Sequence, residues 1–341
     1  MAHNTGQCLP MNIIVQEFIE YVQIHGLKPE ETILWMMKSK LSCNLRLYPF
    51  YMKSILEGYG NGFEKASIYF GQNTYLEISF NACFYAYFAY MLGGLIRRMG
   101  CKIRPYERIA GETDAAIKKS VEMLEQVFLG NVPMDEAIEK AISLFDEIPK
   151  KVVHRPKVAI FGDFYVRDND VMNQDLIHFI EKAGGEVIST PYNDYVKITI
   201  ENILRRAVAR GDYLKTGLYS GIMSILKLFE DKYYKYFINI LGPPPVIQPK
   251  KLEKHLADFN IKLLNSGESY ENILKIFYII ENHPDVVLFV QTNPAFCCPS
   301  LVTEAMTHEI TRITRIPVVT LTYDGTNELK NDVLIPYLQG R

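Results

Sequence analysis

The chain has 341 residues, of which 48% are hydrophobic and 22% charged, and its formal net charge is −2. These values are typical of a globular protein, and the length is sufficient for two domains with separate cores. The 37 lysines and arginines are balanced by 39 aspartates and glutamates and form no long basic block. We therefore expect neither nucleic acid nor a membrane as a partner.

The first residues do not combine a basic segment with an apolar one, so we expect no secretory signal and a cytoplasmic location. The longest apolar run, 82–96, is shorter than the roughly 20 residues of a spanning helix. It predicts a buried helix that ends at Gly93 and Gly94. In a cytoplasmic protein, the six cysteines are expected to be thiols or metal ligands, because disulfides are rare in that compartment.

The N-terminal part, 1–80, predicts a first α/β lobe. An apolar stripe over 13–22 indicates a helix that ends near His25. The following pattern predicts a strand over 32–37, a loop over 38–43, a helix over 49–57, a glycine-rich turn and a strand over 66–70. The order strand, helix, strand is that of one βαβ unit.

A helical segment, 81–155, is expected to connect this lobe to a second one. Its periodicity indicates an aromatic helix around Tyr87 and further helices over 113–129 and 134–145. The aromatic cluster in the first of these helices is interpreted as packing, with a docking surface as the alternative.

The remaining residues, 156–341, predict a second α/β lobe. We expect a strand over 157–162, a loop over 163–168, a helix over 170–183 with a C-cap at Gly184, and a strand over 186–190, which together imply a parallel pair. Gly242 and the prolines after it must end any helix. The pattern then repeats, with the expected elements being a helix over 273–280, a strand over 286–291, a loop over 292–299, a helix over 301–314 and a strand over 318–323. The predicted fold class is therefore α/β, with two Rossmann-like lobes that carry parallel sheets, each doubly wound or nearly so, and a cleft between them.

Common nucleotide-binding and protease motifs are missing from the sequence, including the phosphate loop G-x-x-x-x-G-K-[ST], H-E-x-x-H and G-x-S-x-G. The glycines at 58–62 follow a predicted helix and precede a strand, which is the wrong order for a dinucleotide loop. We expect no ATP site in this chain.

The cysteines are more informative. Cys8 and Cys297 each stand two residues before a proline at the predicted first turn of a helix. The positive end of a helix lowers the pKa of a nearby thiol and stabilises a bound anion. Cys43 and Cys297 follow predicted strands, so they are expected at the carboxyl ends of the sheets, where α/β folds bind ligands. Three thiols meeting there are able to hold an iron–sulfur cluster; the alternative is that each is a small buried hydrophobe. The lack of a C-x-x-C pair argues against a zinc knuckle or a ferredoxin-type run.

Several segments then resemble a known family. They are Gly6-Gln-Cys-Leu-Pro10, Ser42-Cys-Asn-Leu-Arg-Leu-Tyr48, Arg104-Pro-Tyr-Glu107, Gly162-Asp-Phe-Tyr-Val-Arg-Asp-Asn-Asp170 and Asn293-Pro-Ala-Phe-Cys-Cys-Pro299. In this order they are similar to the C-terminal part of the acyl-CoA dehydratase activase-related proteins. Those proteins are similar to the subunits of 2-hydroxyacyl-CoA dehydratase and benzoyl-CoA reductase and to the double-cubane cluster proteins. The resemblance extends from about residue 7 to residue 337.

The resemblance implies an oxygen-sensitive cluster, most often [4Fe-4S], held by three cysteines between Rossmann-like lobes. Cys8, Cys43 and Cys297 match the family's cysteines, with Cys298 as an alternative to Cys297. The sequence departs from the family at Gln7, at Ser42 and Leu47, and at Cys298. A double cubane remains an alternative, although Cys83 lies in an apolar helix and is interpreted as structural.

The resemblance also implies partners. An ATP-dependent activase would supply low-potential electrons, and because the sequence contains no activase region, we expect a separate chain to do so. The implied substrate class is an acyl-CoA, and we expect a homodimer or heterodimer. Two functions follow: an enzyme subunit for radical dehydration or reduction of an acyl-CoA or other small substrate, or a non-catalytic carrier or delivery subunit for a cluster.

Other polar residues have weaker signals. Arg167, Asn169 and Asn173 lie in a strand-to-helix loop where an anion or substrate would bind, and local pairing of Arg167 with Asp163 or Asp170 is the alternative. Arg104 and Glu107 are interpreted as a structural salt bridge, with a place in the cleft as the alternative. The seven histidines do not show ligand spacing.

Overall fold

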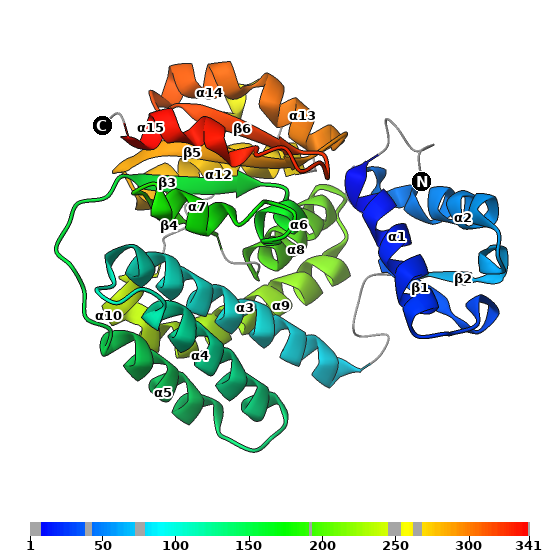
Figure 1. Ribbon diagram of the computed structural model, residues 1–341, viewed down its shortest axis with the longest axis horizontal. Coiled ribbons are helices and arrows are strands. Elements are labelled where there is room, and N and C mark those ends of the chain that lie inside the picture. Colours follow the sequence, from blue (N-terminus) through cyan, green and yellow to red (C-terminus); the bar gives the residue numbers. More distant parts are fainter. Residues whose placement is uncertain are drawn as a thin grey trace.

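The computed structural model describes residues 8–37, 43–71, 79–190, 193–244, 254–261 and 268–339. In these ranges the chain is α/β, with mostly helices and two parallel sheets (Figure 1). This confirms the predicted class. The predicted loop over 38–43 and the departures from the family at Gln7 and Ser42 lie wholly or mostly outside the described residues.

The N-terminal part is one βαβ unit, as predicted, preceded by a helix. Its elements are α1 (Leu9–Ile24), β1 (Ile33–Met37), α2 (Tyr48–Tyr59) and β2 (Ser67–Gly71). The two strands are parallel, with Ile33 opposite Ser67. The apolar faces of α1 and α2 pack against each other in a small core. On each helix, apolar residues at helical spacing form this face, and Val15 of α1 and Met52 of α2 are fully buried in it.

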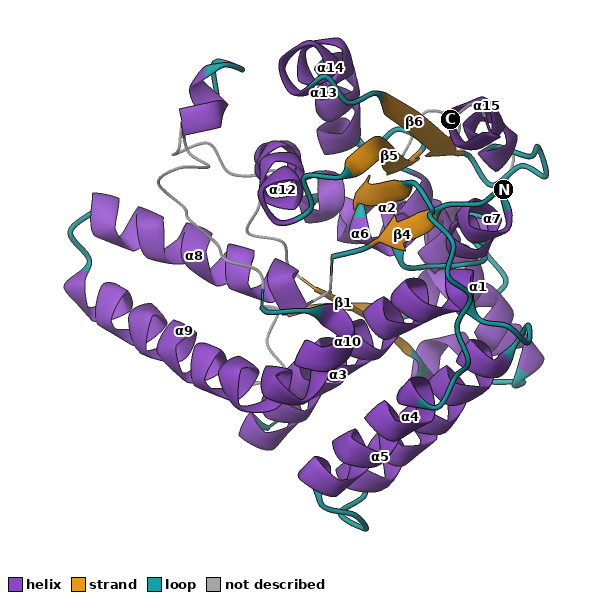
Figure 2. Ribbon diagram, turned by 90° about the vertical axis from the view of Figure 1, so that its left-hand side faces the viewer, coloured by secondary structure: helices purple, strands orange, loops and turns teal. Residues whose placement is uncertain are grey.

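The larger sheet has four parallel strands in the order β4-β3-β5-β6. They are β3 (Lys157–Gly162), β4 (Glu186–Ile188), β5 (Val286–Pro294) and β6 (Val318–Tyr323). Both central strands are buried almost throughout, as expected for a sheet covered on both faces. One face packs against α7 (Leu176–Lys182) and α15 (Ile335–Gln339), and the other against α12 (Glu268–Asn282) and α14 (Thr307–Thr314) (Figure 2).

A third region consists of helices. It contains α3 (Phe80–Ile103), α4 (Glu112–Phe128), α5 (Met134–Asp146), α8 (Asn193–Ala209), α9 (Tyr213–Tyr234) and α10 (Ile238–Leu241). Their shared core joins residues of α3, α4 and α5 to Leu226 and Tyr233 of α9. The segment predicted to connect two lobes therefore packs against helices that come much later in the chain.

Several predicted boundaries are wrong. The helix α3 does not end at Gly93 and Gly94 but continues to Ile103, because Leu95 and Met99 are buried on its core face. A short helix, α6 (Phe164–Arg167), occupies the expected loop, and α7 begins at Leu176, after Asp175 adopts a left-handed φ of 57°. The helix predicted over 301–314 is two helices, α13 (Cys298–Ala305) and α14. Helices α8 and α9 were not predicted.

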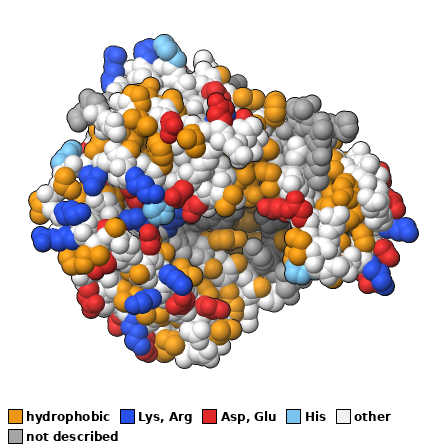
Figure 3. Space-filling view, viewed as in Figure 1, with side chains coloured by type: hydrophobic (Ala, Val, Ile, Leu, Met, Phe, Trp, Pro, Cys, Tyr) orange, Lys and Arg blue, Asp and Glu red, His pale blue; other side chains and the backbone are white. Residues whose placement is uncertain are grey.

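Within the described residues, no helix is both long and apolar enough to cross a membrane. The space-filling view shows the surface hollowed between the N-terminal βαβ part and the rest of the molecule (Figure 3). The first turn of α1 lies at this junction, because the backbone N–H of Leu9 donates to the carbonyl oxygen of Ala295 at 3.1 Å.

Candidate functional site

Four of the six cysteines are the N-cap or the first residue of a helix. Cys8 is the N-cap of α1, Cys43 precedes a short 3-10 helix, Cys297 is the N-cap of α13, and Cys298 is the first residue of that helix. Prolines at the starts of α1 and α13 suit these positions, because the first turn of a helix does not need their missing N–H. The predicted placement of Cys8 and Cys297 at helix starts is confirmed.

Cys8 lies close to Cys43 and Cys298, which are far from it in the sequence. The charges of both thiolates are near enough to raise the pKa of Cys8. The Nδ2 of Asn44 lies 3.2 Å from the Sγ of Cys298, which joins the segment after Cys43 to α13. Three distant segments thus bring thiols to one place.

The two neighbouring cysteines of α13 differ in environment. Cys297 is buried, with 5% of its surface exposed, whereas Cys298 is exposed. Phe296 precedes them with a φ of 61°, a conformation that costs a non-glycine residue about 1–2 kcal/mol. Such left-handed residues gather at functional sites, and this one turns the chain from β5 into α13.

Burial dominates the chemistry of Cys8. Its thiol is 8% exposed, and burial raises its pKa to about 11. The expectation that the start of a helix lowers the pKa is therefore wrong for this residue. The hydroxyl of Tyr48 donates a hydrogen bond to the Sγ of Cys8 at 3.0 Å, which favours the thiolate and opposes burial.

A buried carboxylate lies beside these thiols. Asp163 follows β3 directly and is the N-cap of α6, where its Oδ1 accepts from the N–H of Val166 at 2.9 Å. Burial raises its pKa, against the opposing charges of Arg167 and Lys275. Its charge reaches Cys8, so the thiols lie at the carboxyl end of β3.

Among the described residues, no three His, Cys, Asp or Glu side chains are grouped closely enough to hold a metal ion. A cubane cluster binds its thiolates through different irons, so its ligands lie farther apart than those of one ion. The charges of Cys43 and Cys298 both act on Cys8, and three thiols fit a cluster of this kind in their number and chemistry.

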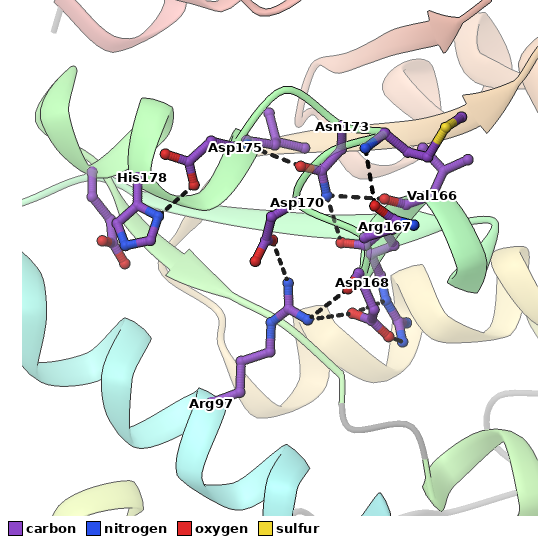
Figure 4. Close-up of polar contacts among 12 residues, drawn as sticks. Arg97, Val166, Arg167, Asp168, Asp170, Asn173, Asp175 and His178 are labelled. Atoms are coloured by element: carbon purple, nitrogen blue, oxygen red, sulfur yellow. Dashed lines mark hydrogen bonds and ion pairs between the residues drawn. The ribbon is translucent and has the colours of Figure 1, made fainter. Parts of the chain in front are cut away.

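The predicted anion site has a different structure from the thiol site. Arg167 is 2% exposed, and its Nη2 lies 2.6 Å from Asp168 (Figure 4). Its Nη1 donates to the hydroxyl oxygen of Thr190 at 2.6 Å. Local pairing is thus what the structure contains, with Asp168 in place of Asp163 or Asp170. The carboxylates of Asp168 and Asp170 also pair with Arg97 of α3.

The two asparagines of this loop serve its backbone. Asn169 accepts from the N–H of Met172, and Asn173 donates to the carbonyls of Val166 and Arg167 (Figure 4). These bonds hold the long turn between α6 and α7. Neither residue has a described contact that points to a ligand.

The other residues that the sequence singled out make contacts that stabilise the fold. Arg104 pairs with Glu181 at 2.8 Å, and Glu107 accepts from the N–H groups of Gly111 and Thr113 at the start of α4. Cys101 is buried, and burial raises its pKa to about 12. Cys83 lies in α3, as expected.

Tyr48, Asn44 and Asp163 were missed as site residues. Asp163 carried a usable signal, because an aspartate between a buried strand and a polar loop is a helix N-cap at the carboxyl edge of a sheet. Asn44 and Tyr48 lie in the segment 42–48 that resembles the family, but nothing in their spacing indicated contact with a thiol.

Comparison with known proteins gave no identification. No family model, no curated protein and no solved structure matches this chain.

Proposed function

We propose that this chain is an iron–sulfur protein of the 2-hydroxyacyl-CoA dehydratase/reductase type. In this proposal, two Rossmann-like lobes hold a [4Fe-4S] cluster in the hollow between them, and an ATP-dependent activase supplies low-potential electrons. The observation that carries the proposal is the proximity of Cys8, Cys43 and Cys298, which come from three distant segments. The resemblance of these segments to the family adds the expected electron donor and an acyl-CoA substrate.

The ligands in the proposal are Cys8, Cys43 and one member of the pair Cys297 and Cys298. Two contacts favour Cys298. Its Sγ is next to the side-chain amide of Asn44, and its negative charge raises the pKa of Cys8. Cys297, which the family pattern matches, is the alternative.

A three-cysteine cluster supplies an iron with an open position, which acts as a Lewis acid or relays an electron. Cys8 and Tyr48 have the chemistry that such a cluster would need. Cysteines bind metal as thiolates. Because burial raises the pKa of Cys8 to about 11, its thiol is protonated at neutral pH, and binding of a cluster must release this proton. The hydroxyl of Tyr48 stabilises the Cys8 sulfur in its charged form.

One cluster is the form that the described residues favour. The two cysteines outside the site, Cys83 and Cys101, both lie in α3, and Cys101 is packed into the core beside β3. Neither is among the groups that most strongly shift the pKa of Cys8, whereas Cys43 and Cys298 are.

The test of the function is electron transfer under anaerobic conditions. The reconstituted protein is mixed with an activase-type ATPase and a reductant, and cluster reduction is followed by electron paramagnetic resonance with and without ATP. The proposal expects reduction only with ATP. Equal reduction in both mixtures would favour the carrier function over the enzyme.

A further inference from the structure

A cavity of about 690 Å³ is lined by residues of α3, α8, α9 and α12. Figure 2 labels these four helices. This volume is in the range of sites for small ligands. None of the cysteines lines the cavity, so it is distinct from the thiol site.

Many charges on the cavity wall neutralise one another. Lys197 lies 2.9 Å from Asp194 and 3.1 Å from Glu230, and Arg205 lies 2.7 Å from Glu201. These pairs tie α8 to itself and to α9. The charges of Lys197 and Arg205 are therefore balanced by neighbouring carboxylates and do not require a ligand.

Arg98 of α3 is different. It lines the cavity and is partly buried, yet it makes no ion pair or side-chain hydrogen bond with the described residues. Its neighbour His283 does not compete for an anion, because burial and the positive charges of Arg98 and Lys157 lower the pKa of His283 to about 4. A guanidinium in such a place is suited to a carboxylate or a phosphate, which it binds through two parallel hydrogen bonds.

The cavity wall also contains a buried carboxyl group. Glu271 is 2% exposed, and its Oε1 accepts from the Nδ2 of Asn202 at 3.0 Å. Burial raises its pKa to about 7. The positive charge of Lys275 lowers this pKa, and the negative charge of Glu201 raises it. Near neutral pH the carboxyl group therefore carries a proton in part of the molecules and is able to donate a hydrogen bond.

The spacing of these groups sets the length of a ligand. Arg98 is close enough to Tyr278 to lower its pKa. Tyr278 and Glu271 are both on α12 and seven positions apart, which is roughly 10 Å along a helix. Residues at this spacing share one face of the helix, so both groups line the same cavity.

We infer that this cavity binds a small organic anion, with its carboxylate or phosphate at Arg98 and a second hydrogen-bonding group at Glu271 and Asn202. The inference goes beyond the proposed function and does not depend on a cluster. It is tested on the metal-free protein, so its failure is separate from failure of the iron–sulfur assignment.

The probes are adipate for the carboxylate, glycerol 3-phosphate for the phosphate, and adipamide as the neutral analogue of adipate. Binding is measured by isothermal titration calorimetry with the wild type, Arg98→Gln and Arg210→Gln. Arg210 is an exposed arginine just after α8 and serves as the control.

We expect at least one of the two anions to bind and adipamide not to bind. Arg98→Gln should weaken anion binding by about tenfold or more, because it removes a charge-assisted pair, whereas Arg210→Gln should leave it unchanged. Adipate alone or glycerol 3-phosphate alone would identify which anionic group the site accepts. Absence of binding by both anions, equal binding of adipamide, or equal weakening by both variants would overturn the inference.

A second variant keeps the test decisive if Arg98→Gln fails to fold. The wild type should bind its anion more tightly at pH 6 than at pH 8.5, since Glu271 is neutral at the lower pH and charged at the higher. Glu271→Gln should remove most of this difference, because its amide stays neutral. The same pH dependence in both proteins would contradict the inference.

Discussion

The side-chain amide of Asn44 lies 3.2 Å from the Sγ of Cys298, although 254 positions separate these residues in the sequence. With the bond from the N–H of Leu9 to the oxygen of Ala295, it joins the N-terminal βαβ part to the turn between β5 and α13. The thiols are therefore assembled by the fold from both ends of the chain. Relative movement of the two parts would change the distances between them.

Tyr48→Phe should make a cluster at this site harder to reduce. The variant removes the hydroxyl that donates to the Sγ of Cys8, and such bonds stabilise the additional negative charge of the reduced state. A hydrogen bond of about 1 kcal/mol corresponds to roughly 40 mV for one electron. A redox titration should show a downward shift of this order, while Tyr51→Phe, an exposed position on the same helix, should show none. An unchanged potential in Tyr48→Phe would exclude this role.

Gly162→Ala should destabilise the protein by more than about 2 kcal/mol. Gly162 has a φ of 114°, and a Cβ there would lie 2.4 Å from the carbonyl oxygen of Thr292 on the neighbouring strand. The closely packed end of β3 and β5 would have to separate. Urea denaturation measures the change, and Gly221→Ala is the matched control. Gly221 lies within α9, where a Cβ would meet nothing within 4 Å, so this variant should gain about 1 kcal/mol.

Acid should destabilise the protein partly through His283. Its pKa is about 4 in the folded protein, below that of an unfolded histidine, because burial and nearby positive charges disfavour the protonated ring. The unfolded chain therefore binds more protons between pH 6.5 and pH 4, and stability falls as the pH is lowered through this range.

The contribution is of the order of 2 kcal/mol after allowance for the partial exposure of the ring. His283→Gln should lose correspondingly less stability between pH 7 and pH 4.5 in urea titrations, and His308→Gln on exposed α14 is the control. An equal acid-induced loss in the wild type and in His283→Gln would show that this histidine is not responsible.

The isolated chain should not hydrolyse ATP, because its sequence has no phosphate loop. The measurement is phosphate release by protein that has been purified free of any activase. Sustained turnover that co-purifies with the chain would contradict the separate-activase part of the proposal.

The strands were the most predictable elements. The local sequence pattern and the turn residues around it predicted β3 and β6 with their observed limits. β3 is buried almost throughout, whereas β6 is an edge strand in which buried residues alternate with more exposed ones. The end of α3 was not predictable in the same way. Gly93 and Gly94 are unfavourable in a helix, but burial of α3 against other helices outweighs their low propensity.

The site was predictable only in part. Prolines two residues after Cys8 and Cys297 indicated thiols at helix starts, which the structure contains. The contact of Tyr48 with Cys8 and the burial that raises the pKa of Cys8 depend on tertiary packing, for which the local sequence holds no signal. Similarly, the cavity at Arg98 brings α3 together with α8, α9 and α12, which come much later in the chain, and α8 and α9 were not predicted.

The most direct test of the account is the iron content after anaerobic reconstitution with iron and sulfide. The account predicts about four iron atoms per chain in the wild type, as expected for one [4Fe-4S] cluster. Alanine at Cys8, at Cys43 or at Cys298 should abolish iron retention, while alanine at Cys83, outside the site, should leave it intact. If alanine at Cys297 abolishes retention and alanine at Cys298 does not, the third ligand is Cys297. A wild type that retains no iron, or equal loss in the variants at Cys8, Cys43 and Cys83, would contradict the iron–sulfur assignment.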